Sequence, residues 1–395
     1  MKSILWILAA FALTLQWFAA YFFRVPLAPP WAAILPGLGI FGAAFILSWG
    51  AELAELEIPQ SLALAFLALV AVLPEYAVDI YFAWTAGKDP SYIHYATANM
   101  TGSNRLLIGI GWPVVLFFFG WVSHKRQLEL DKDQSVELSL LLVASLYAFV
   151  IPFKHTLSLL DTVFFLGLFA FYMILASRAH HETPELEGPA ELFGRWPRGI
   201  RIFMTFFFFI LSGLTIFIAA KPFAEGLLAT GRAFKIEEFI LVQWLAPLAS
   251  ESPEFIVAIL FALKGRAQAG IGTLVSSKVN QWTLLVGMLP LAYAISSGSP
   301  HAMVLDGRQT EEILLTASQS LFAMTILANF RFSLGEALAL LILFSTQLFF
   351  TQTSVRLAYS GLYVLLSVGM IAFIPAYRHG VRDLLSRTFR LRLRR

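Results

Sequence analysis

Apolar residues fill long, nearly unbroken stretches of this chain, and polar residues gather in short segments between them. Each stretch is about 20 residues long, the length that an α-helix needs to cross the hydrocarbon core of a bilayer. We therefore expect an all-α integral membrane protein with about twelve transmembrane helices. The predicted spans are 3–23, 31–50, 60–86, 91–119, 136–152, 158–177, 200–220, 237–264, 270–296, 311–329, 333–350 and 355–376.

The composition agrees with a membrane protein and excludes several other classes. The 395 residues are 58% hydrophobic and 13% charged, whereas soluble proteins carry about 25% charged residues. Cysteine is absent, which rules out disulfides and thiolate metal sites. No phosphate loop, catalytic triad or zinc motif is visible, so we expect neither an enzyme, nor a nucleic-acid partner, nor a permanently bound cofactor.

Basic residues predict the orientation of the chain. An even number of spans puts both termini on one side. Lysine and arginine favour the cytoplasmic side of a membrane. The side with the termini carries more of them, so we expect both termini in the cytoplasm and the chain in the cell (inner) membrane, in contact with lipid. These residues are Lys2, Lys125, Arg126, Lys132, Arg178, Arg195, Arg198, Lys264, Arg266, Arg331 and the arginine-rich end.

Two apolar segments each contain a Pro-Glu pair. Pro74-Glu75 lies within 62–84, and Pro253-Glu254 lies within 239–263. Each is followed by a second helix with a small, polar middle, Ala98 to Asn104 and Gly272 to Lys278. An ionisable group within the bilayer is costly and is by default functional. Two of them at matching points indicate an ion pathway.

The predicted orientation makes the two motif helices antiparallel, so the halves form inverted five-helix repeats. Such repeats place a substrate site near the bilayer midplane, where broken helices meet. We expect Pro74 and Pro253 to supply the breaks, because proline removes a backbone N–H. The expected organisation is an extra helix in 1–30, repeats in 31–177 and 200–350, a cytoplasmic linker in 178–199, and an extra helix with a basic tail in 351–395.

A dehydrated cation needs oxygen ligands and negative charge. Glu75 and Glu254 would supply the charge, and Gly102 and Gly272 would let helices approach closely. Neutral oxygens could come from backbone carbonyls and from Asn99, Thr101, Ser103, Ser250, Ser276 and Ser277. The pattern therefore predicts a membrane transporter for inorganic cations.

These residues resemble the Ca2+/cation antiporter superfamily, which includes sodium/calcium exchangers. Its two alpha-repeats carry a Pro-Glu helix followed by a Gly-Asn-x-x-Gly-Ser-Asn helix, and both are recognisable here. The resemblance implies a core of about ten helices over roughly 31–350 and antiport of Ca2+ for Na+ or H+. It also implies Glu75 and Glu254 as the central ligands of the metal ion, with Ser103 and Ser277 beside them.

Several residues depart from the family pattern. Leu107 and Gln281 stand where the family has Asn or Asp, and Lys278 stands where it has Asn. Asp79 adds a carboxylate four residues after Glu75, and Glu251 adds one three residues before Glu254, each on the same helical face as its partner. These residues are further candidates for the ion site.

Charge counting leaves two forms of transport open. Glu75, Glu254 and Lys278 alone sum to −1, which suits a monovalent cation or protons. If Asp79 and Glu251 also face inward, the sum is −3 and a divalent cation fits. Buried carboxylates that can take up protons favour H+ over Na+ as the coupling ion.

Two alternatives remain. One is a monovalent cation/H+ antiporter in which Lys278 is a resident charge rather than a fixed ion pair. The other is a membrane sensor or scaffold that does not transport, with Lys278 and Arg105 locking the site. We expect Arg105 to pair with Asp79 or with a loop carboxylate.

Overall fold

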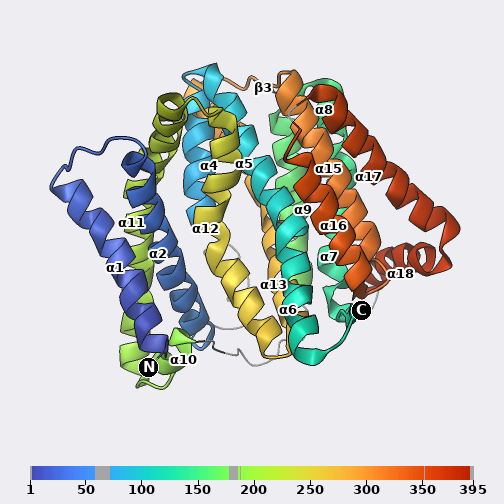
Figure 1. The fold of residues 1–395 in the computed structure, drawn as a ribbon, viewed down its shortest axis with the longest axis horizontal. Helices are drawn as coiled ribbons and strands as arrows, with labels where there is room; N and C mark the ends of the chain where they lie inside the picture. Colours follow the sequence, from blue (N-terminus) through green and yellow to red (C-terminus); the bar gives the residue numbers. More distant parts are fainter. Residues whose placement is uncertain (1, 58–71, 178–185, 187, 351, 392–395) are drawn as a thin grey trace.

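The computed structural model describes residues 2–57, 72–177, 186, 188–350 and 352–391. The helices of the first part of the chain stand side by side in a bundle, with the start of α1 at its lower edge in Figure 1. Their bounds are α1 Lys2–Phe22, α2 Trp31–Glu55, α4 Leu73–Ala86, η1 Pro90–Tyr92, α5 Ile93–Leu106, η2 Leu107–Gly111, α6 Trp112–Ser123, β1 Gln127–Glu129, η3 Lys132–Gln134, α7 Ser135–Ala148, α8 Val150–Lys154, β2 Thr156–Leu157, α9 Leu159–Ala176 and α10 Pro189–Gly194.

The second part of the chain continues the same bundle, and α18 lies at its lower edge in Figure 1. The elements are α11 Arg198–Phe234, α12 Glu238–Leu263, α13 Ala267–Asn280, η4 Gln281–Leu285, α14 Val286–Ser297, β3 Met303–Val304, α15 Gly307–Leu327, β4 Arg331–Ser333, α16 Leu334–Gln347, α17 Thr353–Phe373 and α18 Pro375–Leu391. The start of α1 and the helix α18 therefore lie at the same edge of the bundle.

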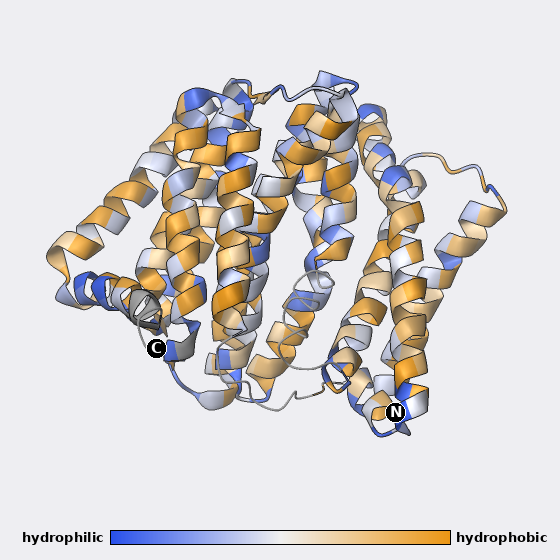
Figure 2. Ribbon diagram, turned by 180° about the vertical axis from the view of Figure 1, so that it is seen from behind, coloured by the Kyte–Doolittle hydropathy of each residue, from blue (hydrophilic) through white to orange (hydrophobic). Residues whose placement is uncertain are grey.

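Hydrophobic residues run along the helices, and hydrophilic residues concentrate at the two ends of the bundle (Figure 2). Among the described residues, eight helical segments are long and apolar enough to cross a membrane. This confirms the all-α membrane fold. The total of twelve spans stays a prediction. The predicted span 60–86 begins outside the described residues, α16 is short, and the helices over 270–296 and 311–329 are not among the eight. The eight segments are Ser3–Phe22, Trp31–Glu55, Pro90–Ser123, Ser135–Lys154, Leu159–Ala176, Arg198–Phe234, Glu238–Leu263 and Thr353–Phe373.

One predicted boundary is wrong. The span expected at 200–220 is part of α11, which continues to Phe234 and contains Pro222. A proline removes a single helical hydrogen bond, and packing of the helix can outweigh that loss. The helix ends where Lys235 takes a left-handed backbone conformation with φ of 56°. Lys221 therefore lies within a helix rather than in a loop.

Two short strand pairs link the two halves of the chain. β1 pairs antiparallel with β4, matching Gln127 with Ser333, and β2 pairs antiparallel with β3. In each pair one strand comes from the first half and the other from the second half. Because one membrane-length passage, α7 and α8, separates β1 from β2, the pairs lie at opposite ends of the bundle.

The described part of the basic end forms the helix α18. Pro375 starts α18, a position where its missing N–H costs nothing. Gly380 packs tightly on the segment after α15: a Cβ there would lie 2.6 Å from the Ala328 carbonyl oxygen. The Ser139 hydroxyl donates to the Leu384 carbonyl at 3.2 Å. The helix α18 thus contacts both halves of the chain at this end of the bundle.

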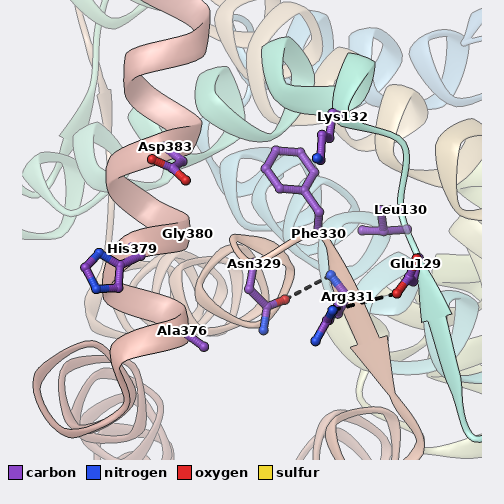
Figure 3. Close-up of a pocket in the computed structure, with 10 residues that line it drawn as sticks. All are labelled: Glu129, Leu130, Lys132, Asn329, Phe330, Arg331, Ala376, His379, Gly380 and Asp383. Atoms are coloured by element: carbon purple, nitrogen blue, oxygen red, sulfur yellow. Dashed lines mark hydrogen bonds and ion pairs between the residues drawn. The ribbon is translucent and has the colours of Figure 1, made fainter.

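A polar cavity of about 430 Å³ lies between α18, β1 and the turn before β4 (Figure 3). None of the predicted ion-site residues lines it. The Arg331 side chain lies 3.8 Å from Glu129, and both are largely exposed. The lining residues are Glu129, Leu130, Lys132, Asn329, Phe330, Arg331, Ala376, His379, Gly380 and Asp383. This cavity is a feature of the end surface and is separate from the ion site.

Candidate functional site

The helices that carry the two glutamates run antiparallel. The Tyr95 hydroxyl donates to the Glu238 carboxylate, which joins the starts of α5 and α12. The Ser296 hydroxyl donates to the Trp84 carbonyl at 2.5 Å, which joins the ends of α14 and α4. Because α5 begins just after α4 ends, α12 starts where α4 finishes. Figure 1 places this end opposite the start of α1.

The prolines act differently from each other. Pro74 lies in the first turn of α4, directly before Glu75, a position that helices tolerate well. Pro253 lies inside α12, which is continuous from Glu238 to Leu263. The helix break expected at Pro253 is therefore wrong. Packing keeps the helix intact, and the missing N–H leaves the carbonyl of Ala249 without its helical donor.

Both polar helices change their winding at the same place in the motif. After Ser103, α5 passes into the π-helical segment η2, and after Ser277, α13 passes into the π-helical segment η4. Each segment is 5 residues long and begins four residues after its serine. Short π-helical segments occur frequently at functional sites. The two halves therefore share an irregular backbone feature beside their polar residues.

Buried carboxyls and neutral oxygens gather around Glu75. The Glu75 side chain is 3% exposed and lies close to Ser103, Gln281 and Lys278. Glu251 is also buried and is close to Glu75, Ser103 and Gln281. The structure therefore brings residues of both halves together around Glu75.

Glu254 lies at the edge of this group. Its side chain is partly exposed, and Glu75 is the carboxylate that acts on it. The Ser250 hydroxyl donates within its own helix, to the carbonyls of Ala246 at 3.2 Å and Pro247 at 3.4 Å. Gln281 reaches the Ser277 hydroxyl at 3.5 Å. The role of Ser250 as an ion ligand therefore stays a prediction.

Asp79 and Asn99 form a second polar pair, one helical turn from Glu75. Both side chains are fully buried and lie close to each other. Among the described residues, none is in hydrogen-bonding geometry with either carboxylate oxygen of Asp79 or with the Asn99 amide. Burying such groups unpaired is costly. The pair is therefore suited to a cation, a proton or water.

Both additional carboxylates lie on the same side of the Glu75–Glu254 level. α4 runs away from the end that holds the start of α1, and Asp79 follows Glu75. α12 runs toward that end, and Glu251 precedes Glu254. Asp79 and Glu251 are thus displaced toward the far end of the bundle, so negative charge is distributed unequally across the bundle.

Lys278 is fully buried at the centre of the bundle. Its ammonium donates to the Asn104 side-chain oxygen at 2.9 Å and to the Asn104 carbonyl at 3.3 Å. It also lies 5.0 Å from the ring centre of Trp282. Asn104 follows Ser103 as Lys278 follows Ser277, so these matched positions meet. Lys278 stays near Glu75 and Glu251 without a direct ion pair to either in the described residues.

Arg105 does not pair as expected. Its guanidinium forms an ion pair with Glu312 of α15, and both side chains are buried. Arg105 is also stacked 5.2 Å from the ring centre of Trp244. The carboxylate partner is thus neither Asp79 nor a loop residue. The spacing in α5 explains the error: Arg105 is two positions after Ser103 and points roughly 200° around the helix from it.

The two glycines expected to allow close packing behave differently. A Cβ on Gly102 would lie 1.8 Å from the Gln243 carbonyl oxygen, so α5 and α12 approach closely there. A Cβ on Gly272 would meet only the end of the Gln134 side chain, at 2.7 Å. The prediction for Gly272 is wrong. The tight contact between α12 and α13 is at Gly270, where a Cβ would lie 2.6 Å from the Ala258 carbonyl oxygen.

The acidic group has many oxygens available to a ligand. Among the described residues, polar atoms of Glu75, Asp79, Ser103, Glu251, Glu254 and Gln281 are buried without a hydrogen-bond partner. No three acidic or histidine side chains of the described part of the chain converge closely enough to form a metal site by themselves. A Ca2+ ion takes six to eight oxygens. Neutral groups such as Ser103 and Gln281 would have to contribute several of them.

The sequence reasoning missed the residues around Glu312. Gln243 donates to the Glu312 carboxylate at 3.0 Å, and Arg356 of α17 lies 3.3 Å from it. Trp282, beside Lys278, was also missed. A charged residue at membrane depth, such as Glu312 or Arg356, is the signal that could have found this group.

Comparisons with known proteins agree with the architecture. The model of the family described as sodium/calcium exchanger protein matches residues 29–178 and 204–352. A crystal structure of the H+/Ca2+ exchanger CAX is 43% identical, with a TM-score of 0.94, over 99% of this chain and 98% of that one. No curated protein matches the chain.

More distant structures share the fold alone. Native YfkE is 14% identical, with a TM-score of 0.61, over 91% of this chain and 100% of that one. The sodium-calcium exchanger NCX_Mj is 14% identical, with a TM-score of 0.53, over 88% of this chain and 100% of that one. The family model covers most of the chain, and it matches both Pro-Glu helices. The chain therefore belongs to the sodium/calcium exchanger family, the Ca2+/cation antiporters that its two motifs resemble.

Proposed function

We propose that this protein exchanges Ca2+ for H+ across the membrane by alternating access. The carrying observation is the group of buried carboxyls from both halves around Glu75, whose oxygens include atoms that have no hydrogen-bond partner within the described residues. The likeness to the H+/Ca2+ exchanger CAX supports Ca2+ and H+ as the two exchanged ions. No ATP-binding motif is apparent in the sequence, so an ion gradient drives the exchange.

Glu75 and Glu254 are the proposed central ligands, and Ser103, Ser277 and Gln281 supply neutral oxygens. With Asp79, Glu251 and Lys278 included, the ionised groups sum to −3, which favours a divalent cation over a monovalent one. When Ca2+ leaves, protons neutralise the same carboxylates, because a buried charge without a partner is costly. Glu251, which is close to Glu75, would share in both steps.

The proposed orientation has both termini in the cytoplasm and the protein in the cell membrane. The basic residues of the loops at the terminal end support it. The residues Lys125, Arg126 and Arg331 lie at this end, beside β1 and β4. The proposed repeats, 31–177 and 200–350, are supported by the two segments that the family model matches.

A specific observation keeps a second candidate in view. Lys278 lies near Glu75 and Glu251, and an ammonium group at this place would be a resident cation that favours exchange of a monovalent cation for H+. A scaffold that does not transport is the third candidate, in which the Lys278–Asn104 contact closes the site.

The test is Ca2+ flux into proteoliposomes that contain a Ca2+-sensitive dye, under an imposed pH gradient and then under a Na+ gradient. We expect flux with the pH gradient, and a loss of at least 100-fold in Glu75→Gln and in Glu254→Gln. Flux of Na+ or K+ without Ca2+ would favour the second candidate. No flux of any of these ions would favour the scaffold. A Lys125→Gln variant, altered at an exposed residue of the end surface, is the matched control.

A further inference from the structure

Four helices meet at one buried carboxylate, Glu312. The Glu312 side chain of α15 is 1% exposed. One of its oxygens pairs with Arg105 of α5 and accepts from Gln243 of α12 at 3.0 Å. The other oxygen lies 3.3 Å from Arg356 of α17. This group, which we call the Glu312 cluster, consists of Arg105, Gln243, Glu312 and Arg356.

The charges of the cluster and its immediate neighbour balance. Arg356 also lies 3.9 Å from Glu311, so two guanidinium groups face two carboxylates. Removing one member would leave a buried charge without a partner, which costs much more than the pair itself contributes. The arrangement therefore holds only one relative position of its four helices at low cost.

The Glu312 cluster is connected directly to the proposed ion site. Arg105 is two residues after Ser103, on the opposite face of α5. Gln243 also lies 3.4 Å from the Thr101 hydroxyl, and its backbone carbonyl packs against Gly102. Gln319 of α15 donates to the Arg105 carbonyl at 3.2 Å. α5 is therefore held between the ion site on one face and the cluster on the other.

The second half has no matching arginine. The residue that follows Ser277 by two positions is Val279, which cannot form an ion pair. Arg356 in turn lies on α17, outside both proposed repeats. The Glu312 cluster thus fixes α5 and not α13, and the additional helix α17 contributes Arg356 to the cluster.

We infer that Glu312 is a positioning residue for the cation site: it fixes α5 and α12 relative to each other, and Arg356 of α17 completes it. Groups that orient metal ligands from behind typically change metal affinity about 10- to 100-fold when they are removed. The inference rests on the proposed function, because it assigns Ser103 and the α12 carboxylates to the cation. By this inference, α17, which lies outside both proposed repeats, contributes to cation binding.

The test compares the half-saturating Ca2+ concentration and the maximal flux of full-length variants in proteoliposomes. We expect Glu312→Gln to raise the half-saturating Ca2+ concentration at least ten-fold, with a smaller change in maximal flux. Arg356→Gln should raise the half-saturating Ca2+ concentration several-fold. Arg356→Lys should bring this concentration most of the way back to the wild-type value, because the ion pair uses a single nitrogen. Glu129→Gln, which removes an exposed ion pair with Arg331, is the control.

Arg356→Gln and Arg356→Lys carry the test if Glu312→Gln does not fold. Folded Arg356→Gln protein with wild-type half-saturation would overturn the positioning role. So would a fall in maximal flux alone that follows the loss of folded protein, since that result indicates a purely structural cluster. A wild-type protein without Ca2+ flux would instead overturn the proposed function, and this inference with it.

Discussion

The two motif regions, α4 to α6 and α12 to α14, share a π-helical segment after the motif serine but differ in their charges. Both carry a Pro-Glu pair and a serine followed by a π-helical segment. The two Pro-Glu helices, α4 and α12, run antiparallel to each other. At the next matched position, the first region has Asn104 and the second has Lys278. The π-helical segment follows a motif that both regions share, whereas the charge depends on single residues that they do not share.

This difference gives the site a direction. The extra carboxylates Asp79 and Glu251 match Ala258 and Val72 in the other half, and both lie toward the far end of the bundle. A symmetric frame with one-sided charge can present different electrostatic environments to ions that arrive from opposite sides. The comparison can be tested by changing matched positions separately.

The largest expected effect concerns the matched use of glycine. Gly102→Ala should destabilise the protein by about 3 kcal/mol or more, because the added Cβ would strike the Gln243 backbone. Gly272→Ala should change stability by about 1 kcal/mol or less, since only a flexible side chain must move. Thermal unfolding in detergent measures both. Equal losses in the two variants would contradict the unequal packing.

The next effect separates the two extra carboxylates. Glu251→Gln should raise the half-saturating Ca2+ concentration about ten-fold, because Glu251 shares Ser103 and Gln281 with Glu75. Asp79→Asn should raise it only a few-fold, because Asp79 faces Asn99. Flux at varied Ca2+ measures both. A larger effect of Asp79→Asn would move the centre of the site toward the Asp79–Asn99 pair.

Lys278→Asn makes the second region carry the residue of the first. Removing a buried positive charge beside two carboxylates should lower the half-saturating Ca2+ concentration, by up to about ten-fold. The same flux measurement, with Lys125→Gln as the control, follows the change. Weaker Ca2+ affinity in Lys278→Asn would indicate that the contact with Asn104 holds the site together.

The smallest effect concerns matched helix starts outside the site. The Ser158 N–H donates to Asp161 at 2.7 Å, and the Ser333 N–H donates to Glu336 at 2.6 Å, in capping boxes that open α9 and α16. Ser158→Ala and Ser333→Ala should each cost about 1 kcal/mol of stability, because each removes the cap hydroxyl. Thermal unfolding of the two variants and of the double variant measures this. A cost at one site alone would show that the likeness of the two regions does not extend to their energetics.

The sequence by itself determined the class of the protein, its two motifs and most helices. Apolar stretches of bilayer length and an intramembrane Pro-Glu pair are local signals, because each can be recognised from a single segment and the bilayer that it crosses. Glu75 and Glu251 could be nominated in this way, since a carboxylate inside an apolar helix stands out without any knowledge of its neighbours.

Only the tertiary structure decided which partners these groups meet. Arg105 pairs with Glu312, 207 positions away along the chain, and Lys278 meets Asn104 rather than a glutamate. The rotation of each helix and its packing against other helices fix such contacts. The position of a residue in the sequence gives neither the rotation nor the neighbours. For the same reason α12 continues through Pro253: its neighbours outweigh the lost hydrogen bond, and that balance is a property of the assembled bundle.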